Sequence, residues 1–381
     1  MSMVKRARYE EMILESLRCM PVTTLLGPRQ CGKTTLARSI WEKLGGTYLD
    51  LEKRRDRIRL SNPETFLDSL SGLVVIDEVQ REPYLMEVLR PLADRTANPA
   101  AFLILGSASP ALIRGASESL AGRTGFVDLH GFDIKEVRTS CIEKLWFRGG
   151  FPRSFLAESD RKANDWLEAF TRTLVERDLP MLGSFETSVS MRRLWTMLAS
   201  IHGQILNCSH LGRSLSLSYK TVQKYLDLLE GAFMIRRIPP WFENAGKRLV
   251  RSPKVYIRDS GILHTFLQID SLFQLKGHIV SGASWEGFVL EQFFSFHGDR
   301  NCFFWGTHQG GEMDLVAIRK GNRYGIEVKL SESPGITRSM QIALSDLGLR
   351  HIYVIYPGRE KYPLSDSITV WPVRKISSLP V

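Results

Sequence analysis

The order of apolar runs and amphipathic segments predicts an α/β protein. A helix is expected over residues 8–20, where Ile13 and Leu17 mark an apolar face with helical spacing. The expected strands of the first third of the chain are residues 22–26, 47–51, 73–76, 102–105 and 125–129. Because these strands alternate with helical segments, we expect a parallel sheet with helices on both faces.

Three further patterns follow along the chain. Residues 140–200 carry apolar and aromatic side chains at helical spacing, which predicts packed helices in the position of a lid after the first domain. Residues 205–258 predict a short helix at 205–211, a turn, a second helix and two strands. A helix at 285–294 then precedes the last expected strands, residues 302–305, 310–318, 324–329, 352–355 and 368–373. The predicted domains are therefore residues 1–135, 136–200, 201–258 and 259–381.

Composition narrows the class of protein. The chain has 381 residues, 43% of them hydrophobic, which is typical of a globular protein and too long for one ordinary core. A formal net charge of +10 favours a polyanionic partner. No apolar run approaches the roughly 20 residues that cross a bilayer, and residues 1–8 lack the apolar core of a signal peptide. We therefore expect a cytoplasmic protein without membrane association. The five cysteines are far apart and odd in number, so they indicate neither a disulfide framework nor a zinc ribbon.

A glycine-bounded loop follows the first predicted strand and opens a helix. Its residues are Gly27, Pro28, Arg29, Gln30, Cys31, Gly32, Lys33, Thr34 and Thr35. This is a G-x-x-x-x-G-K-T motif in the strand-to-helix context that supports nucleotide binding. The two glycines let backbone N–H groups surround a phosphate. Lys33 is expected to reach the β- and γ-phosphates, and Thr34 to contact Mg²⁺. We therefore predict that ATP and Mg²⁺ bind here.

Polar residues at the ends of neighbouring strands are the candidate catalytic groups. Asp77 is expected to hold Mg²⁺ through water and Glu78 to polarise the attacking water, although such an acidic pair can also cap a helix. Ser107 is a candidate sensor of the γ-phosphate, or part of an ordinary turn. Arg123 is expected near a phosphate, either in the same chain or as an arginine finger that needs a homo-oligomer. Arg114 is the second candidate, and a surface arginine is the alternative.

These segments together resemble a known family. The chain is similar to the AAA-type ATPases of the widespread prokaryotic group with an uncharacterised C-terminal region in its G-P-R-Q-x-G-K-T-T-L loop, I-D-E-V-Q strand end, G-S turn and L-A-G-R segment. Its G-G-F-P and E-R-D segments, at residues 149–152 and 176–178, are similar to that group as well. The resemblance covers nearly the whole chain. It implies a P-loop ATPase core of AAA type and says little about biological role.

The order helix, turn, helix and hairpin over residues 201–258 predicts a winged helix-turn-helix. In such motifs the second helix enters the major groove of DNA. Basic residues, Lys254 among them, are concentrated on this element, and phosphate contacts of this kind give affinity without sequence readout. The expected DNA contacts are Tyr219, Lys220, Lys224, Arg236, Arg237, Lys247, Arg248 and Arg251. The alternative is a packing module between domains that does not bind DNA.

The C-terminal pattern resembles the PD-(D/E)XK nuclease fold, an α/β restriction-endonuclease-like domain. An acid on a helix, G-E-x-D and then E-V-K on successive strands are most similar to its Holliday-junction-resolvase-like and restriction-like branches. The resemblance implies that Asp314 and Glu327 hold one or two Mg²⁺, with Glu286 as a further ligand. Lys329 would stabilise charge on the phosphate or help to deprotonate the nucleophile. Alternation with period two places Glu327 and Lys329 on one face of their strand. The alternatives are a structural ion-pair network and a nuclease fold kept as a binding module.

Together these patterns predict a DNA-binding ATPase of bacterial or archaeal type. It would couple hydrolysis to remodelling, movement along or processing of DNA, including branched DNA, and metal-dependent cutting is left open. One alternative is an ATP-dependent, non-cutting regulator or defence sensor whose nuclease-like domain only binds a partner. Another is a protein-remodelling ATPase whose turnover does not respond to DNA.

Overall fold

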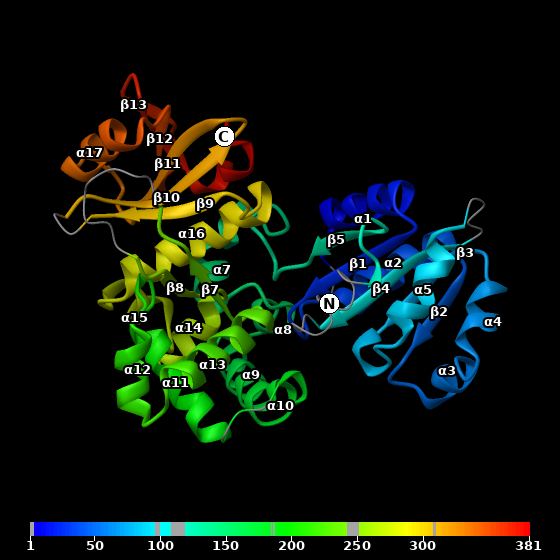
Figure 1. Ribbon diagram of the computed structural model, residues 1–381. Helices are drawn as coiled ribbons and strands as arrows, with labels where there is room; N and C mark the ends of the chain where they lie inside the picture. Colours follow the sequence, from blue (N-terminus) through cyan, green and yellow to red (C-terminus); the bar gives the residue numbers. More distant parts are fainter. Residues whose placement is uncertain are drawn as a thin grey trace. The chain divides into compact units, whose positions relative to one another are not determined.

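The chain folds into two compact units (Figure 1). The computed structural model describes residues 4–95, 100–107, 119–183, 185, 187–241, 251–307 and 310–381. Unit 1 comprises Met1–Gly131, Leu179–Ser184 and Gly231–Phe233. Unit 2 comprises Phe132–Asp178, Phe185–Glu230 and Met234–Val381. The finer division of residues 136–381 into three domains stays a prediction.

Unit 1 is built on a sheet with the strand order β2-β3-β4-β1-β5, in which each neighbouring pair runs parallel. Its strands are β1 (Val22–Gly27), β2 (Thr47–Asp50), β3 (Gly72–Asp77), β4 (Ala100–Ser107) and β5 (Thr124–Asp128). Because all of them point the same way, their carboxyl ends meet at one edge of the sheet. In α/β folds this is the edge where ligands bind.

Helices cover both faces of this sheet, and each face has its own apolar core (Figure 1). The helical elements of unit 1 are α1 (Ala7–Cys19), α2 (Lys33–Leu44), α3 (Arg54–Arg59), α4 (Pro63–Asp68), η1 (Val79–Arg81), α5 (Leu85–Ala93) and α10 (Leu179–Leu182). Ile13 of α1 and Ile40 of α2 share one core with Val75 of β3. Leu89 of α5 and the next strand residue, Ile76, share the other. Successive side chains of a strand point to opposite faces, so a strand covered on both sides is apolar throughout, and the predicted parallel core is confirmed.

Unit 2 begins with a helical region. Its elements are η2 (Thr139–Cys141), α7 (Ile142–Arg148), α8 (Pro152–Phe155), α9 (Asp160–Thr173), η3 (Leu174–Asp178) and α11 (Ser188–Ser200). The aromatic side chains form part of its interior. Trp146 packs edge-on against Trp285 with ring centroids 5.2 Å apart, and Phe151 lies 4.8 Å from Phe170. These aromatic residues therefore pack in the core.

Two helices and a small antiparallel sheet follow in unit 2. They are β6 (Gln204–Ile205), α12 (Cys208–Leu215), α13 (Tyr219–Gly231), β7 (Ile235–Ile238) and β8 (Lys254–Ile257), with the sheet order β6-β8-β7. The first helix begins at Cys208, later than predicted, because Asn207 caps it by accepting a hydrogen bond from the His210 N–H at 2.9 Å. Residues 204–205 instead pair with β8.

A mixed sheet with the order β13-β14-β12-β11-β10-β9 forms the C-terminal part of unit 2. Its strands are β9 (Cys302–Gly306), β10 (Glu312–Arg319), β11 (Asn322–Val328), β12 (His351–Tyr356), β13 (Tyr362–Ser365) and β14 (Ile368–Pro372). The accompanying helices are α14 (Ser260–Phe266), α15 (Leu272–Gly277), α16 (Ser281–His297), α17 (Arg338–Leu347) and η4 (Val373–Ser378). The pairs β9–β10, β10–β11 and β13–β14 are antiparallel. The pairs β11–β12 and β12–β14 are parallel. Across the described ranges, no helix combines the length and apolarity of a membrane crossing.

Candidate functional site

The loop between β1 and α2 wraps around the ammonium group of Lys33. Lys33 Nζ donates hydrogen bonds to the carbonyl oxygens of Gly27 and Pro28, at 2.9 and 2.8 Å, and the residue is only 6% exposed. Gln30 and Gly32 adopt left-handed backbone conformations, with φ of 61° and 101°. This curl delivers the chain to the amino end of α2, where unpaired backbone N–H groups favour an anion.

Two features that the sequence did not indicate constrain this loop, close packing at Gly27 and hydrogen bonds from Arg6. A Cβ at Gly27 would come within 2.3 Å of the Leu129 carbonyl oxygen, so a side chain does not fit there. Arg6 donates to the carbonyl oxygens of Cys31 at 3.1 Å and His130 at 2.9 Å. Arg6 thus ties the loop to the segment that follows β5. An isolated arginine before the first helix carries no sequence signal for this role.

Asp77 ends β3 at the same edge of the sheet, and it is 2% exposed. Its carboxylate accepts hydrogen bonds from the Tyr48 hydroxyl at 2.7 Å and from the backbone N–H of Glu78 at 3.0 Å. Burial and the adjacent Asp77 carboxylate raise the pKa of Tyr48. Tyr48 lies on the neighbouring strand β2, so the sheet register sets the orientation of the carboxylate.

Glu78 follows in a left-handed backbone conformation, with φ of 59°. Such strain in a residue other than glycine is concentrated at functional sites. Gln80 donates to its carboxylate. Burial raises the pKa of Glu78, the Lys33 ammonium opposes the rise and Asp77 adds to it. Lys33, Asp77 and Glu78 therefore share one electrostatic environment, as expected for a catalytic site.

The hydroxyl of Thr34 and the carboxylate of Asp77 fit Mg²⁺. Both are hard oxygen ligands, and a Mg²⁺ that binds with a nucleotide takes few protein ligands, because phosphates and water supply the rest. The backbone of Ser107 pairs with Gly27, which places it beside the first residue of the loop. The side chain of Ser107 and the whole of Arg114 lie outside the described part of the chain.

Arg123 lies at the amino ends of the strands, opposite the carboxyl ends where the loop begins. Its carbonyl oxygen accepts a hydrogen bond from the N–H of Val22, the first residue of β1, at 3.2 Å, and its guanidinium pairs with Asp94. The phosphate loop begins at the opposite end of β1. The predicted contact of Arg123 with a phosphate in its own chain is therefore wrong, because residues that precede parallel strands lie far from their carboxyl ends. A role in a neighbouring subunit stays a prediction.

A second charged cluster lies in unit 2. Burial and the neighbouring Asp314 carboxylate raise the pKa of Glu286, on α16, to about 7 and that of Glu327, on β11, to about 8. Asp314 accepts a hydrogen bond from the Val328 N–H at 2.8 Å, and Lys329 pairs with Glu327 at 2.6 Å. The fold thus brings together the residues that the nuclease-like pattern predicted.

A lysine from β8 occupies this cluster. Lys254 Nζ lies 2.6 Å from Glu312 Oε1, 3.4 Å from Glu286 Oε1 and 4.0 Å from Asp314 Oδ1, and the residue is 4% exposed. Burial alone would lower the pKa of Lys254, but these carboxylates outweigh it and raise the pKa. In the part of the chain that is described, no set of three or more His, Cys, Asp or Glu side chains is arranged to hold a metal. The predicted ligands Glu286, Asp314 and Glu327 therefore do not fit a divalent ion in this arrangement, because Lys254 supplies the cation.

The predicted DNA contacts on α13 and after residue 250 are exposed to solvent. Tyr219 is 56% exposed, and Lys220, Lys224 and Arg251 are exposed as well. Lys247 and Arg248 lie outside the described residues. An exposed basic helix face is compatible with a polyanionic partner.

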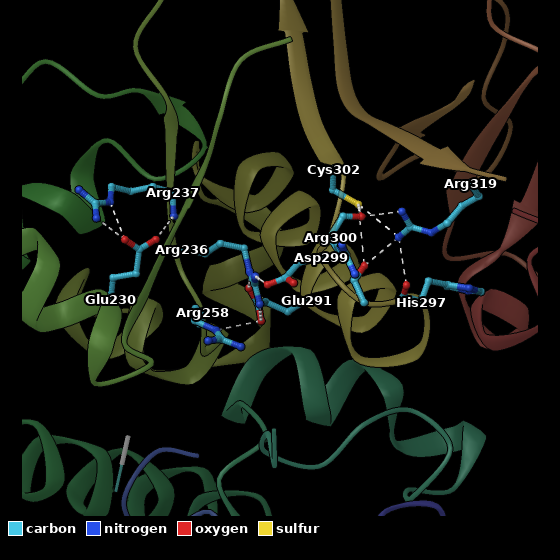
Figure 2. A network of polar contacts seen from close by, with 11 residues as sticks. Glu230, Arg236, Arg237, Arg258, Glu291, His297, Asp299, Arg300, Cys302 and Arg319 are labelled. Carbon is cyan, nitrogen blue, oxygen red and sulfur yellow. Dashed lines mark hydrogen bonds and ion pairs between the residues drawn. The ribbon is translucent and has the colours of Figure 1, made fainter. Parts of the chain in front are cut away.

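Figure 2 shows that the two arginines of β7 are paired within the chain. Arg236 contacts Glu291 at 2.5 Å and Asp299 at 2.6 Å, and its side chain is 11% exposed. Arg237 donates to Glu230 at 2.7 Å. Burial alone would lower the pKa of Arg236, but the two carboxylates raise it. Acids from other elements already pair with Arg236 and Arg237, so contact of these two arginines with DNA stays a prediction that would have to compete with internal ion pairs.

Three stretches of the chain match family models. Residues 20–138 match an AAA domain, residues 140–272 a domain of unknown function (DUF8612), and residues 281–376 a domain of unknown function (DUF4143). "Uncharacterized protein Rv2008c" of Mycobacterium tuberculosis and "Uncharacterized protein Mb2031c" of Mycobacterium bovis are each 45% identical over 374 residues, which cover 98% of this chain and 85% of each relative. The solved Walker-type ATPase PABY2304 of Pyrococcus abyssi, with 16% identity and a TM-score of 0.49, covers 70% of this chain and 96% of that structure. The chain belongs to the family of these mycobacterial proteins, and its residues 20–138 form an AAA domain of the P-loop ATPase class.

Proposed function

We propose that this protein hydrolyses ATP at the loop of residues 27–35 and couples turnover to DNA. The observation that supports hydrolysis is the shared environment of Lys33, Asp77 and Glu78 at the carboxyl edge of the sheet in unit 1. Positive charge, a buried acid and a second acid with a raised pKa are the groups that phosphoryl transfer to water requires.

Each residue would have a distinct task. Lys33 would exchange the carbonyl oxygens of Gly27 and Pro28 for phosphate oxygens, which bear more charge. Mg²⁺, held by Thr34 and Asp77, would neutralise phosphate charge when bound. Glu78, held by Gln80, would orient the attacking water and accept its proton. The left-handed backbone at Glu78 fixes where that carboxylate starts.

The DNA part of the proposal depends on the exposed face of α13. Tyr219, Lys220 and Lys224 are exposed there, and a groove of about 760 Å³ is lined by Tyr219, Gln223 and Arg251 among others. Positive charge attracts phosphodiester groups, and an aromatic ring can stack on a base. Since Arg236 and Arg237 are neutralised internally, the surface proposed for DNA is smaller than the sequence suggested.

Steady-state ATP hydrolysis with and without single-stranded, duplex and four-way-junction DNA tests both parts. We expect Glu78→Gln to lower kcat by about 100-fold or more under every condition. We expect Lys220→Ala/Lys224→Ala to keep the basal turnover of the wild type and to lose most of the stimulation by DNA.

The two parts fail differently. Wild-type turnover in Glu78→Gln would contradict the catalytic assignment. Turnover that no DNA form changes would contradict the coupling to DNA and would favour a protein substrate.

A second function, the non-cutting regulator, is favoured by the position of Lys254. An ammonium group among Glu286, Glu312 and Asp314 leaves no place for the divalent ion that nuclease chemistry uses. In this version the C-terminal domain of unit 2 recognises a partner and does not cut. Cutting of any DNA form by wild-type protein with Mg²⁺ or Mn²⁺, abolished by Lys329→Ala, would contradict it.

A further inference from the structure

We infer that Lys254 is the resident cation of the carboxylate cluster in unit 2 and that it competes there with a divalent metal ion. The cluster would take a metal only when the ammonium group of Lys254 is removed or withdrawn. The inference concerns the acids of α16, β10 and β11 and does not depend on ATP hydrolysis in unit 1.

The charges of the cluster support this assignment. Lys329 pairs with Glu327 at 2.6 Å, which leaves Glu286, Glu312 and Asp314 to share Lys254. Without Lys254 the largely buried Glu286 and Asp314 and the exposed Glu312 would be a group of like charges. Such a group needs a cation, because unpaired buried carboxylates are strongly unfavourable.

The geometry shows why the two cations exclude each other. Oxygen atoms of Glu286, Glu312 and Asp314, which come from two elements, converge within 4.0 Å of the single Nζ atom. A divalent ion such as Mg²⁺ would need oxygens at about 2.0–2.1 Å around the same point. Nζ and a metal ion therefore cannot occupy the site together.

A further buried acid atom shows that the cluster has unused ligand capacity. Glu327 is 5% exposed, and in the described structure its Oε2 atom is buried without a hydrogen-bond partner, whereas Oε1 is paired with Lys329. Asp314 and Glu286 both act electrostatically on Glu327. A divalent cation, with twice the charge of an ammonium group, could bind this oxygen, whereas Lys254 does not.

The strand that carries Lys254, β8, pairs antiparallel with β7. Tyr256, two residues along β8, donates at 2.5 Å to the same Glu286 oxygen that Lys254 contacts. Beyond β7 the backbone continues alongside β9, where the Phe304 N–H donates to the Pro239 carbonyl at 3.0 Å. A shift of β8 away from α16 and β10 would therefore withdraw Lys254 and expose the acids. Metal binding at the cluster would therefore depend on the position of β8.

Binding of Mn²⁺ to the full chain without nucleotide tests the inference. All proteins carry Asp77→Asn, which removes the carboxylate expected to bind metal at the ATP site. We expect Lys254→Met, which keeps an apolar side chain of similar length, to bind one Mn²⁺ at least about ten-fold more tightly than the parent. Adding Asp314→Asn to that variant is expected to abolish the gain. Electron paramagnetic resonance of free Mn²⁺ measures both, and circular dichroism checks folding.

A measurement on the parent alone decides the matter if Lys254→Met fails to fold. Equal Mn²⁺ affinity of the parent and its Asp314→Asn variant supports the inference, because Lys254 already fills the site. Loss of a tight Mn²⁺ site from the parent on Asp314→Asn overturns it. A folded Lys254→Met that gains no Mn²⁺ also overturns it. The Mn²⁺ readout is independent of ATP turnover and of DNA, so failure here leaves the proposed ATPase untouched.

Discussion

The phosphate loop of unit 1 and the carboxylate cluster of unit 2 both surround a lysine ammonium group, but with different oxygens. Lys33 donates to the neutral backbone carbonyls of Gly27 and Pro28. Lys254 lies among the carboxylates of Glu286 and its neighbours. An ammonium group is attracted more strongly to a carboxylate or phosphate oxygen, which carries a net charge, than to a neutral carbonyl oxygen. A phosphate can therefore displace the partners of Lys33, whereas Lys254 is already matched from within the chain.

The acids of the two sites also differ in whether their partners are neutral or charged. In unit 1, the acids Asp77 and Glu78 are oriented by uncharged donors, the Tyr48 hydroxyl and the Gln80 amide. In unit 2, acids are paired with basic side chains from other elements, as Arg236 and Glu291 are in Figure 2. Hydrogen bonds to neutral groups leave a carboxylate its charge for an external cation. Carboxylates are thus left open to an external cation in unit 1, whereas in unit 2 they are paired with cations of the chain itself.

The largest expected effect separates the two lysines directly. Lys33→Ala is expected to lower the kcat for ATP by about 10²–10³-fold, because a cationic donor to the transferred phosphate is lost. Lys254→Met is expected to leave that rate unchanged, because Lys254 belongs to the carboxylate cluster of unit 2. Steady-state hydrolysis by both purified variants checks this. Equal losses would break the comparison.

A smaller effect concerns the ion pairs that hold unit 2 together. Arg236→Met is expected to lower the free energy of unfolding by about 3 kcal/mol, because the largely buried Glu291 loses its closest partner and keeps Arg258, at 3.1 Å. The matched control is Lys220→Met on the exposed face of α13, which is expected to change stability by no more than about 0.5 kcal/mol. Urea-induced unfolding followed by circular dichroism measures both. Similar values for the two variants would show that the pair with Glu291 is not integral to the fold.

The smallest expected effect is a dependence on pH. His264 is buried, with Nδ1 2.8 Å from the Phe147 carbonyl oxygen and Nε2 2.7 Å from Ser284 Oγ. Burial lowers the pKa of His264 from 6.5 to about 4. Between these values the unfolded chain binds more protons than the folded chain, so stability is complete above pH 6.5 and falls as pH decreases toward 4. The expected loss from His264 between pH 7 and pH 5 is about 2 kcal/mol.

Comparison of the wild type with His264→Gln isolates that contribution. The variant is expected to be less stable at pH 7 but to lose about 2 kcal/mol less between pH 7 and pH 5. Urea midpoints at the two pH values measure the difference. His202, whose pKa burial lowers to about 3, still titrates in the variant and accounts for a remaining slope. Parallel pH profiles of the two proteins would contradict the assignment to His264.

The sequence by itself determined the ATP site of unit 1 and the parallel sheet that carries it. The loop is one contiguous segment, and spacing alone sets which residues bend, which donates and where the helix begins. Asp77 and Glu78 could be assigned because they end an apolar strand, and parallel strands bring such ends to one edge. The same rule places Arg123 at the amino ends of the strands, because it precedes β5, and therefore away from the phosphate loop.

Only the tertiary structure decided what the charged residues of unit 2 do. The sequence predicts Arg236 as a DNA contact and places Lys254 among the basic residues of the same element. Their partners, Glu291 and Glu312, come from elements far along the chain. The energy of a charge depends on the charges and solvent within a few ångströms of it. The tertiary structure determines which groups those are. A residue's type and spacing can therefore predict a site within one segment, but they do not reveal a cation that another strand supplies.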